Sequence, residues 1–229
     1  MGREQSAADD DEPARHDVLA LRIVVVATGT DVGKTHVTCA LLAHLRASKI
    51  PALGWKPIAS GGTEDAKQHA DAAGTDYVHP SYAFAKPISP HLAAREEGVT
   101  IDFEKLRVRA DELERRGGVL VVETAGGMFS PLVPELSKAL APASFVLVAP
   151  DRLGVLHDVT AVARAADIPL AGVVLSTPES SDASTGTNAA EIERLRILPL
   201  LAVFPRAAWD FPESHAAAER VWSAVLARP

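Results

Sequence analysis

Residues 22–35 read RIVVVATGTDVGKT and decide the fold of this chain. The apolar start has the length and composition of a buried strand, and the ending Gly33-Lys34-Thr35 is typical of a phosphate-binding loop that leads into a helix. In such a loop a glycine lets the backbone approach an anion, a lysine supplies a cation, and a threonine hydroxyl binds magnesium. The stretch therefore predicts a strand, a loop and a helix that together bind a nucleoside triphosphate.

The loop departs from the common spacing of its residues. The usual pattern has a glycine five positions before the glycine that precedes the lysine. Thr28 occupies that position in this chain, and Gly29 follows one place later. We therefore expect a phosphate-binding loop of recognisable but shortened form.

Composition and charge limit the partners of the chain. The 229 residues are 47% hydrophobic, enough for a sizeable core, and carry a formal net charge of −7 without a dense cluster of Lys and Arg. Nucleic acid is therefore not expected as a partner. No apolar stretch reaches the roughly 20 residues that cross a bilayer, so no membrane partner is expected. The single cysteine, Cys39, excludes an intrachain disulfide and favours a cytoplasmic location.

Two parts are expected along the chain. Residues 1–17 contain the acidic run 9–12 and lack the apolar core of a secretion signal, which predicts a disordered acidic tail. Residues 18–229 are expected to form a single domain, with a mobile loop rich in Ser and Thr at 178–186.

Short apolar runs alternate with helical patterns along that domain. Such runs are buried on both faces, which is typical of a parallel sheet covered by helices. Strands are expected at 21–27, 52–56, 119–123, 144–149, 171–176 and 200–204, and helices at 35–48, 103–116, 156–166 and 211–226. Together with the phosphate-binding loop, this pattern predicts a P-loop NTPase-like α/β fold, in which ligands bind beyond the carboxyl ends of the strands.

Two charged residues close expected strands at that edge. Lys56 precedes a Pro and a Ser-Gly-Gly turn, and it either aims its ammonium into the phosphate cleft or lies along the surface beside the turn. Glu123 ends a buried strand, where a carboxylate is costly to desolvate unless it meets a cation such as magnesium held by Thr35. The alternative for Glu123 is a carboxylate that accepts local backbone N–H groups. The presence of the phosphate-binding loop favours the functional interpretation of both residues.

Other polar residues give weaker indications. Asp65 could add a second carboxylate to a metal site, and Asp31 lies within the loop either as a turn residue or facing a metal or a substrate amine. The eight histidines show no spacing of a zinc site. For His91 and His157 a place in the site and a place on the surface are equally compatible with the sequence.

Five segments occur in the order and approximate spacing of a known family. They are residues 28–35, 56–61, 82–91, 122–132 and 153–154. Taken together they resemble dethiobiotin synthase, the ATP-dependent enzyme that closes the ureido ring late in biotin synthesis. The resemblance covers about residues 20–205, and its most specific part is the Phe-Ala-x-Pro-x-Ser-Pro-His run at 84–91, since many unrelated nucleotidases share the loop.

The resemblance implies an activity and its ligands. The expected enzyme is a homodimeric ligase that binds ATP, magnesium and 7,8-diaminopelargonate and carboxylates the diamine with carbon dioxide. The carbamate would attack the γ-phosphate, and the neighbouring amine would then close the ring with loss of phosphate. The protein would position the reactants and neutralise charge, as in phosphoryl transfer generally.

The resemblance also implies roles for individual residues. Lys34 and Lys56 would be catalytic, and Thr35, Asp65 and Glu123 would hold magnesium. The remaining contacts to ATP are expected at Gly29, Thr30, Asp31, Val32, Gly33, Ser176 and Pro205, and the contacts to substrate at Ser60, Gly126 and Gly127.

The chain departs from the family pattern at four places. The family's Leu-Gly-x-x-Asn-His reads Leu-Gly-Val-Leu-His-Asp at 153–158, which alters the substrate loop on the dimer side. The family loop reads Gly-Thr-Asp-x-x-Val-Gly-Lys-Thr, so this chain lacks two residues before Val32. Thr124 stands where the family has glycine, and Ser176 or Thr177 stands where the family has an adenine-contacting asparagine. These departures leave open a diverged paralogue that binds nucleotide but acts on another substrate or is catalytically impaired. A regulatory P-loop ATPase switch is a further alternative, disfavoured by Thr28 because such switches have a lysine early in the loop.

Overall fold

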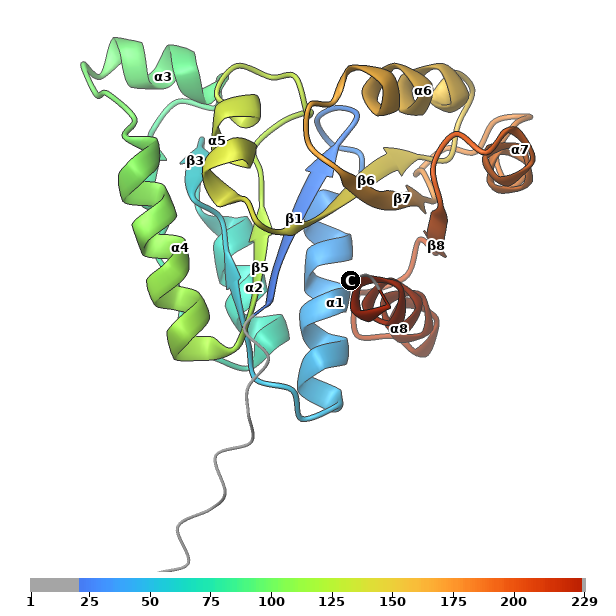
Figure 1. The fold of residues 1–229 in the computed structure, drawn as a ribbon, viewed down its shortest axis with the longest axis horizontal. Coiled ribbons are helices and arrows are strands. Elements are labelled where there is room, and N and C mark those ends of the chain that lie inside the picture. The colour runs from blue at the N-terminus through green and yellow to red at the C-terminus, as the bar shows by residue number, and fades with distance from the viewer. Residues whose placement is uncertain (1–20, 228–229) are drawn as a thin grey trace, which may run out of the picture.

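The computed structural model describes residues 21–227, and Figure 1 shows their arrangement. The tail expected over residues 1–17 lies outside the described residues, as do residues 18–20 at the start of the expected domain. Among the described residues no helix combines the length and the apolar character that a bilayer-spanning segment requires.

A six-stranded parallel sheet forms the centre of the molecule (Figure 1). From one edge to the other its strands are β2 (Ala52–Trp55), β5 (Val119–Glu123), β1 (Leu21–Ala27), β6 (Ser144–Pro150), β7 (Leu170–Ser176) and β8 (Leu200–Phe204). The six strands expected from the apolar runs are confirmed, with ends that differ by at most one residue. Lys56 follows β2 directly instead of closing it.

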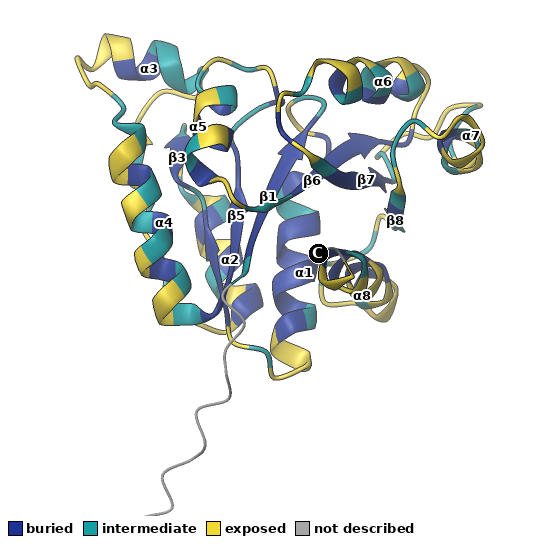
Figure 2. Ribbon diagram, viewed as in Figure 1, coloured by how far each residue is buried: buried dark blue, intermediate teal, exposed yellow. Residues whose placement is uncertain are grey.

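Helices cover both faces of the sheet, as the near-continuous apolar strands require. The side chains of β1 alternate between two cores: Val24 and Val26 pack on one face, and Ile23 and Val25 pack on the other. The first face is covered by α3 (Pro90–Glu96), α4 (Phe103–Gly117), α5 (Val133–Leu140), α6 (Val155–Ala165) and α7 (Asn188–Leu195), and the second by α1 (Lys34–Ala47), α2 (Glu64–Ala73) and α8 (Pro212–Leu226). Figure 2 shows that the strands of the large sheet are mostly buried and that the outer sides of the helices are exposed.

The four expected helices correspond to α1, α4, α6 and α8. Asp102 caps α4 by accepting a hydrogen bond from the Lys105 N–H, as its position predicts. Cys39 is fully buried on α1. Helices α2, α3, α5 and α7 were not expected from the sequence, because they are only 7 to 10 residues long and a helical pattern hardly repeats over two or three turns.

A second, two-stranded parallel sheet was also not expected. It pairs β3 (Ile58–Ser60) with β4 (Tyr82–Phe84), and its register joins Ser60 to Phe84. Strands of three residues give no apolar pattern that the sequence could reveal. This small sheet brings the segment after Lys56 beside the start of the 84–91 run.

The order of strands predicts a binding site beyond the carboxyl end of β1. From β1 the chain proceeds to β2 and β5 on one side and afterwards to β6, β7 and β8 on the other. In open sheets of this type ligands bind beyond the carboxyl ends of the strands where the direction reverses. The phosphate-binding loop follows β1 at this point.

Candidate active site

The phosphate-binding loop runs from Thr28 to Gly33 between β1 and α1. Its start is fixed by a hydrogen bond from the Thr28 N–H to the Val148 carbonyl, 3.0 Å long. Asp31 and Gly33 have positive φ angles of 55° and 99°, so two left-handed residues complete the turn. Asp31 therefore has a turn conformation, and its contact with a ligand stays a prediction. Lys34 begins α1, and its Nζ donates to the Gly29 carbonyl at 3.2 Å, so its ammonium lies across the loop.

Gly33 is required by its surroundings as well as by its φ angle. A Cβ atom at this position would lie 2.4 Å from the Oγ of Ser176. Ser176, at the end of β7, therefore packs directly against the loop backbone. Ser176, which was expected to bind nucleotide, thus contacts the phosphate-binding loop directly.

Glu123 is the centre of a polar cluster beside the loop. Its carboxylate is 1% exposed, and both oxygens have partners. Oε1 accepts from the Thr35 hydroxyl and from the Lys56 ammonium, each at 3.1 Å, and Oε2 lies 2.8 Å from Nε2 of His69. The Lys56 ammonium also donates to Asp65. The structure thus brings together Thr35, Lys56, Asp65 and Glu123, which the sequence predicted to act in one site.

The cluster perturbs the acidity of its members. Burial by itself would raise the pKa of Glu123, but the hydrogen bond with His69 and the neighbouring positive charges, that of Lys56 foremost, bring it down to about 2. Burial would lower the pKa of Lys56, yet Glu123 and Asp65 outweigh it and raise that pKa. For Lys34 burial prevails and, together with the positive charge of Lys56, lowers the pKa. Glu123 and Lys56 are therefore both charged at neutral pH.

A cavity of about 750 Å³ opens in front of this cluster. Its lining joins the loop and the cluster to segments from three other parts of the chain: Ser60 at the end of β3, the stretch 87–90 before and into α3, and Ala125, Gly126 and Ser130 after β5. The most specific segment of the family resemblance therefore forms a wall of the cavity that contains Lys34 and Lys56. We call this cavity the cluster side of the cleft.

A second cavity of about 850 Å³ lies on the other side of the loop and shares Thr30, Asp31 and Gly33 with the first. We call it the far side of the cleft. It is lined by the last residues of β6 and β7 and by the segments that follow β6, β7 and β8, among them Ser176 and Pro205. Both of these residues, expected to contact nucleotide, therefore line one cavity that is continuous with the loop.

The glycine-rich segment after Glu123 has a more specific geometry than the sequence indicates. Gly126, with a φ angle of 78°, lines the cluster side. Gly127 packs against the loop instead: a Cβ there would lie 3.1 Å from Gly29 Cα, and its N–H donates to Ser130. Its contact with substrate stays a prediction. Thr124 is fully buried, and both its N–H and its hydroxyl donate to the Val25 carbonyl at 3.1 Å.

Sequence reasoning missed His69, which is fully buried against Glu123. A signal for it exists, because His69 lies four residues after Asp65 on α2 and residues at that spacing share one face of a helix.

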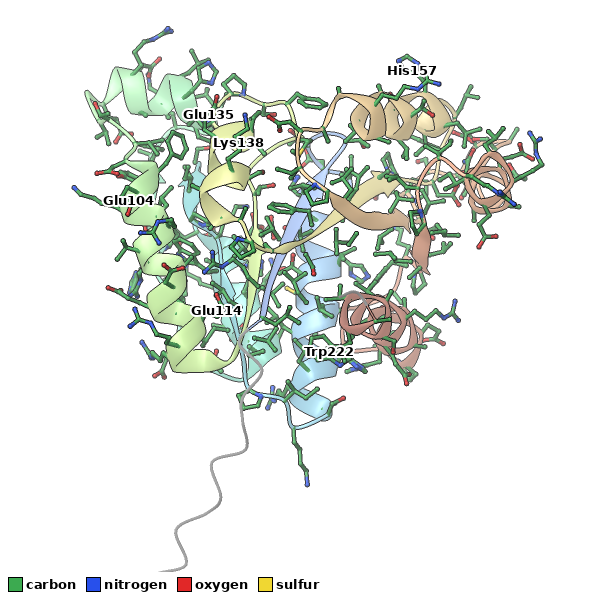
Figure 3. All side chains as sticks on the ribbon, in the orientation of Figure 1. Glu104, Glu114, Glu135, Lys138, His157 and Trp222 are labelled. Carbon is green, nitrogen blue, oxygen red and sulfur yellow. The ribbon has the colours of Figure 1, made fainter. Side chains whose placement is uncertain are left out.

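His157 is exposed on the outer side of α6 (Figure 3). His91 is hydrogen-bonded to Ser89 at 2.8 Å and is absent from the lining of both cavities.

Comparison with known proteins yields close relatives along most of the chain. A protein of Nitrosospira multiformis named ATP-dependent dethiobiotin synthetase BioD is 37% identical over 196 residues, which cover 79% of this chain and 86% of the relative. A protein of the same name from Anaeromyxobacter dehalogenans is 34% identical over 222 residues, 90% of this chain and 97% of the relative. A family model described as AAA domain matches residues 21–208.

Solved structures extend the comparison to the fold. The MinC:MinD cell division protein complex of Aquifex aeolicus superposes with a TM-score of 0.57 over 91% of this chain and 97% of that chain, at 12% identity. The expected P-loop NTPase-like fold is confirmed. At this identity the likeness concerns the fold alone, so it lends no support to a regulatory switch.

Proposed function

The chain belongs to the ATP-dependent dethiobiotin synthetase family, and on that premise we propose that its cleft converts 7,8-diaminopelargonate, carbon dioxide and ATP to dethiobiotin, ADP and phosphate. One observation in the cleft supports this most strongly. The phosphate-binding loop, the Lys56 and Glu123 cluster and the 87–90 wall line one cavity, so nucleotide and a small substrate can meet there. The protein is thus an ATP-dependent ligase of biotin synthesis that acts on small molecules.

The reaction needs positioning more than covalent chemistry from the protein. One amine of the diamine adds to carbon dioxide and loses a proton, which gives a carbamate. A carbamate oxygen attacks the γ-phosphorus as the bond to ADP breaks, and the second amine then attacks the carbamoyl carbon as phosphate leaves. Each step develops negative charge on oxygen, so fixed cations beside the reacting atoms lower the barrier.

Lys34 and Lys56 are the cations that we assign to this task. Lys34 lies across the loop and would exchange its bond to the Gly29 carbonyl for one to the β- and γ-phosphates. Lys56 lies between two carboxylates that raise its pKa, so it stays protonated and cannot act as a base. We therefore assign Lys56 the stabilisation of charge on the carbamate and the transferring phosphate, with Ser60 binding substrate at the same wall.

A magnesium ion would be held by Thr35, Asp65 and Glu123. Hydroxyl and carboxylate oxygens are the ligands that Mg²⁺ prefers, and the ion commonly combines one or two carboxylates with substrate phosphates. The Thr35 hydroxyl and Glu123 Oε1 face each other at 3.1 Å, at the start of α1 where phosphate would lie. The ion would supply charge neutralisation on the triphosphate.

We further propose that two copies of the chain associate and that the enzyme works in the cytoplasm. Phe129 and Leu153, in segments that belong to the family resemblance, are 50% and 80% exposed, and large exposed apolar side chains favour association. Light scattering after size-exclusion chromatography measures the mass in solution, and a single monomeric species at micromolar concentration would contradict the dimer.

The decisive experiment is rescue of a biotin auxotroph that lacks its synthetase, together with detection of dethiobiotin from purified protein, diamine, ATP and bicarbonate. We expect growth and product with the wild-type chain, neither with Lys34→Ala, and both with Lys138→Ala. Lys138 is a matched control because it is an exposed lysine on α5 that pairs with Asp167 (Figure 3). Absence of ATP-dependent product and of diamine binding by calorimetry would refute the proposal.

A further inference from the structure

His69 has no role among those assigned to Lys34, Lys56 and the magnesium ligands. It is a fully buried imidazole on α2, 2.8 Å from the Glu123 carboxylate. Its place depends on Gly54 in β2, since a Cβ at that position would lie 2.6 Å from the Cβ of His69. A glycine in the strand therefore lets α2 approach closely enough for the imidazole to reach Glu123.

The two nitrogens of His69 have different surroundings. Nε2 faces Glu123, whereas Nδ1 is buried and has no hydrogen-bond partner among the described residues. A proton on Nδ1 would be a buried donor without an acceptor, which is costly. The geometry therefore favours a proton on Nε2, which donates to Oε2 of Glu123.

Because of this hydrogen bond, the two oxygens of the Glu123 carboxylate have different partners. Oε2 is engaged by His69, and Oε1 is directed toward Thr35 and Lys56. Asp65, one helical turn before His69 on α2, engages the other side of the Lys56 ammonium. A single short helix thus holds both the carboxylate and the cation of the cluster.

We infer that His69 is a positioning residue for the metal site: by holding Oε2 of Glu123 it keeps Oε1 turned toward Thr35 and the magnesium ion of ATP. The inference rests on the proposed function, because it requires Glu123 to bind magnesium. Residues that orient a metal ligand in this way commonly contribute about 10- to 100-fold to metal affinity. His69 lines neither cavity of the cleft, so its imidazole would act only through Glu123.

The test compares His69→Gln with His69→Asn. The amide nitrogen of glutamine can take the position of Nε2, whereas that of asparagine reaches only the position of Nδ1, so the two variants are equally polar but only one restores the donor. Calorimetry measures binding of ATP with EDTA and then with increasing magnesium chloride, without diamine, so that no turnover occurs. His157→Asn, on the exposed side of α6, is the control for the substitution itself.

We expect His69→Gln to bind magnesium with ATP within about 3-fold of wild type and His69→Asn to bind it about 10-fold or more weakly. Binding of ATP in EDTA should stay unchanged in both variants, because neither alters the phosphate-binding loop. Equal magnesium dependence in the two variants would overturn the role of His69, whatever their melting temperatures. If magnesium does not change ATP binding by the wild-type protein, both the metal site and the role of His69 are overturned. The proposed function is tested separately, by measuring dethiobiotin formation.

Discussion

Replacing Glu123 by glutamine removes a buried negative charge and keeps the shape of the side chain. The carboxylate is 1% exposed and lies within 3.1 Å of Lys56, Thr35 and His69. Without the charge, Lys56 keeps only Asp65 as a partner, and that carboxylate is 37% exposed. We therefore expect Glu123→Gln to destabilise the folded protein at neutral pH in addition to abolishing activity.

The size of the effect follows from the pKa of Glu123. The folded protein lowers it from an ordinary value of 4.5 to about 2. Each pKa unit corresponds to about 1.4 kcal/mol, so the charged form contributes about 3 kcal/mol to the free energy of unfolding. No discount for solvent screening applies, because the group is almost completely buried.

The same shift sets the pH at which the effect disappears. Because the folded pKa lies below the unfolded one, the contribution is complete above the unfolded value and is lost as pH falls through the folded value. The difference in free energy of unfolding between wild type and Glu123→Gln should therefore be about 3 kcal/mol at pH 7. It should shrink progressively below about pH 4.5, toward zero near pH 2.

Urea denaturation followed by circular dichroism, in EDTA at several pH values between 7 and 3, measures this difference. Glu135→Gln is the matched control, because Glu135 is exposed on α5 (Figure 3), and we expect it to change stability by less than about 0.5 kcal/mol. A Glu123→Gln variant as stable as wild type at pH 7, or a difference that stays constant down to pH 3, would refute the electrostatic account of the cluster.

Three further substitutions test the loop and its supports. Lys34→Ala should reduce dethiobiotin formation by about 10²–10³-fold because it removes a cation from the phosphate site. Its melting temperature should stay near that of wild type, and a large drop would indicate a structural lysine instead. Gly33→Ala should destabilise the protein by about 1–2 kcal/mol and weaken ATP binding by about tenfold, since the φ angle of 99° and the contact with Ser176 both oppose a Cβ. Calorimetry with ATP checks this, and unchanged affinity would contradict the contact. Thr124→Gly should lose about 1–2 kcal/mol in urea denaturation with activity retained, because the hydroxyl bond to the Val25 carbonyl disappears and glycine adds unfolded-state entropy. A more stable variant would show that the threonine is strained.

The sequence predicts the large sheet well because long buried strands produce long apolar runs. All six strands of that sheet, and helices such as α1 and α4, have enough residues for a periodic pattern. The elements that it missed are short, and β3 and β4 are formed by pairing between segments more than 20 residues apart. Such pairing depends on the tertiary structure and leaves no local pattern.

The candidate site likewise contains residues that the sequence could place and one that it could not. Lys56, Glu123 and Thr35 could be placed together because each lies at the end of a strand or the start of a helix at one edge of the sheet. His69 could not be placed in this way, because its contact depends on how closely α2 approaches β2 above Gly54. That distance is set by side-chain packing between elements, which spacing along the chain does not reveal.

The departures from the family pattern are unevenly distributed in the cleft. The shortened loop and Ser176 lie on the far side or at its border, where the loop turns through the left-handed Asp31. The cluster side keeps Lys56, Ser60 and the 87–90 wall. Thr124, a third departure, faces the Val25 carbonyl and is not part of the lining of either cavity.

This distribution bears on the alternative of a paralogue with another substrate. A change of substrate would be expected to alter the residues that surround the diamine, since a site discriminates through the groups that contact the differing atoms. In this chain Lys56, Ser60 and the 87–90 wall follow the family, whereas residues 153–158, which the resemblance assigns to the substrate loop, depart from it. Divergence is therefore expected first in the recognition of the nucleotide base and in the affinity for phosphate, and calorimetry of diamine binding to the wild-type chain tests whether the altered 153–158 segment changes the substrate.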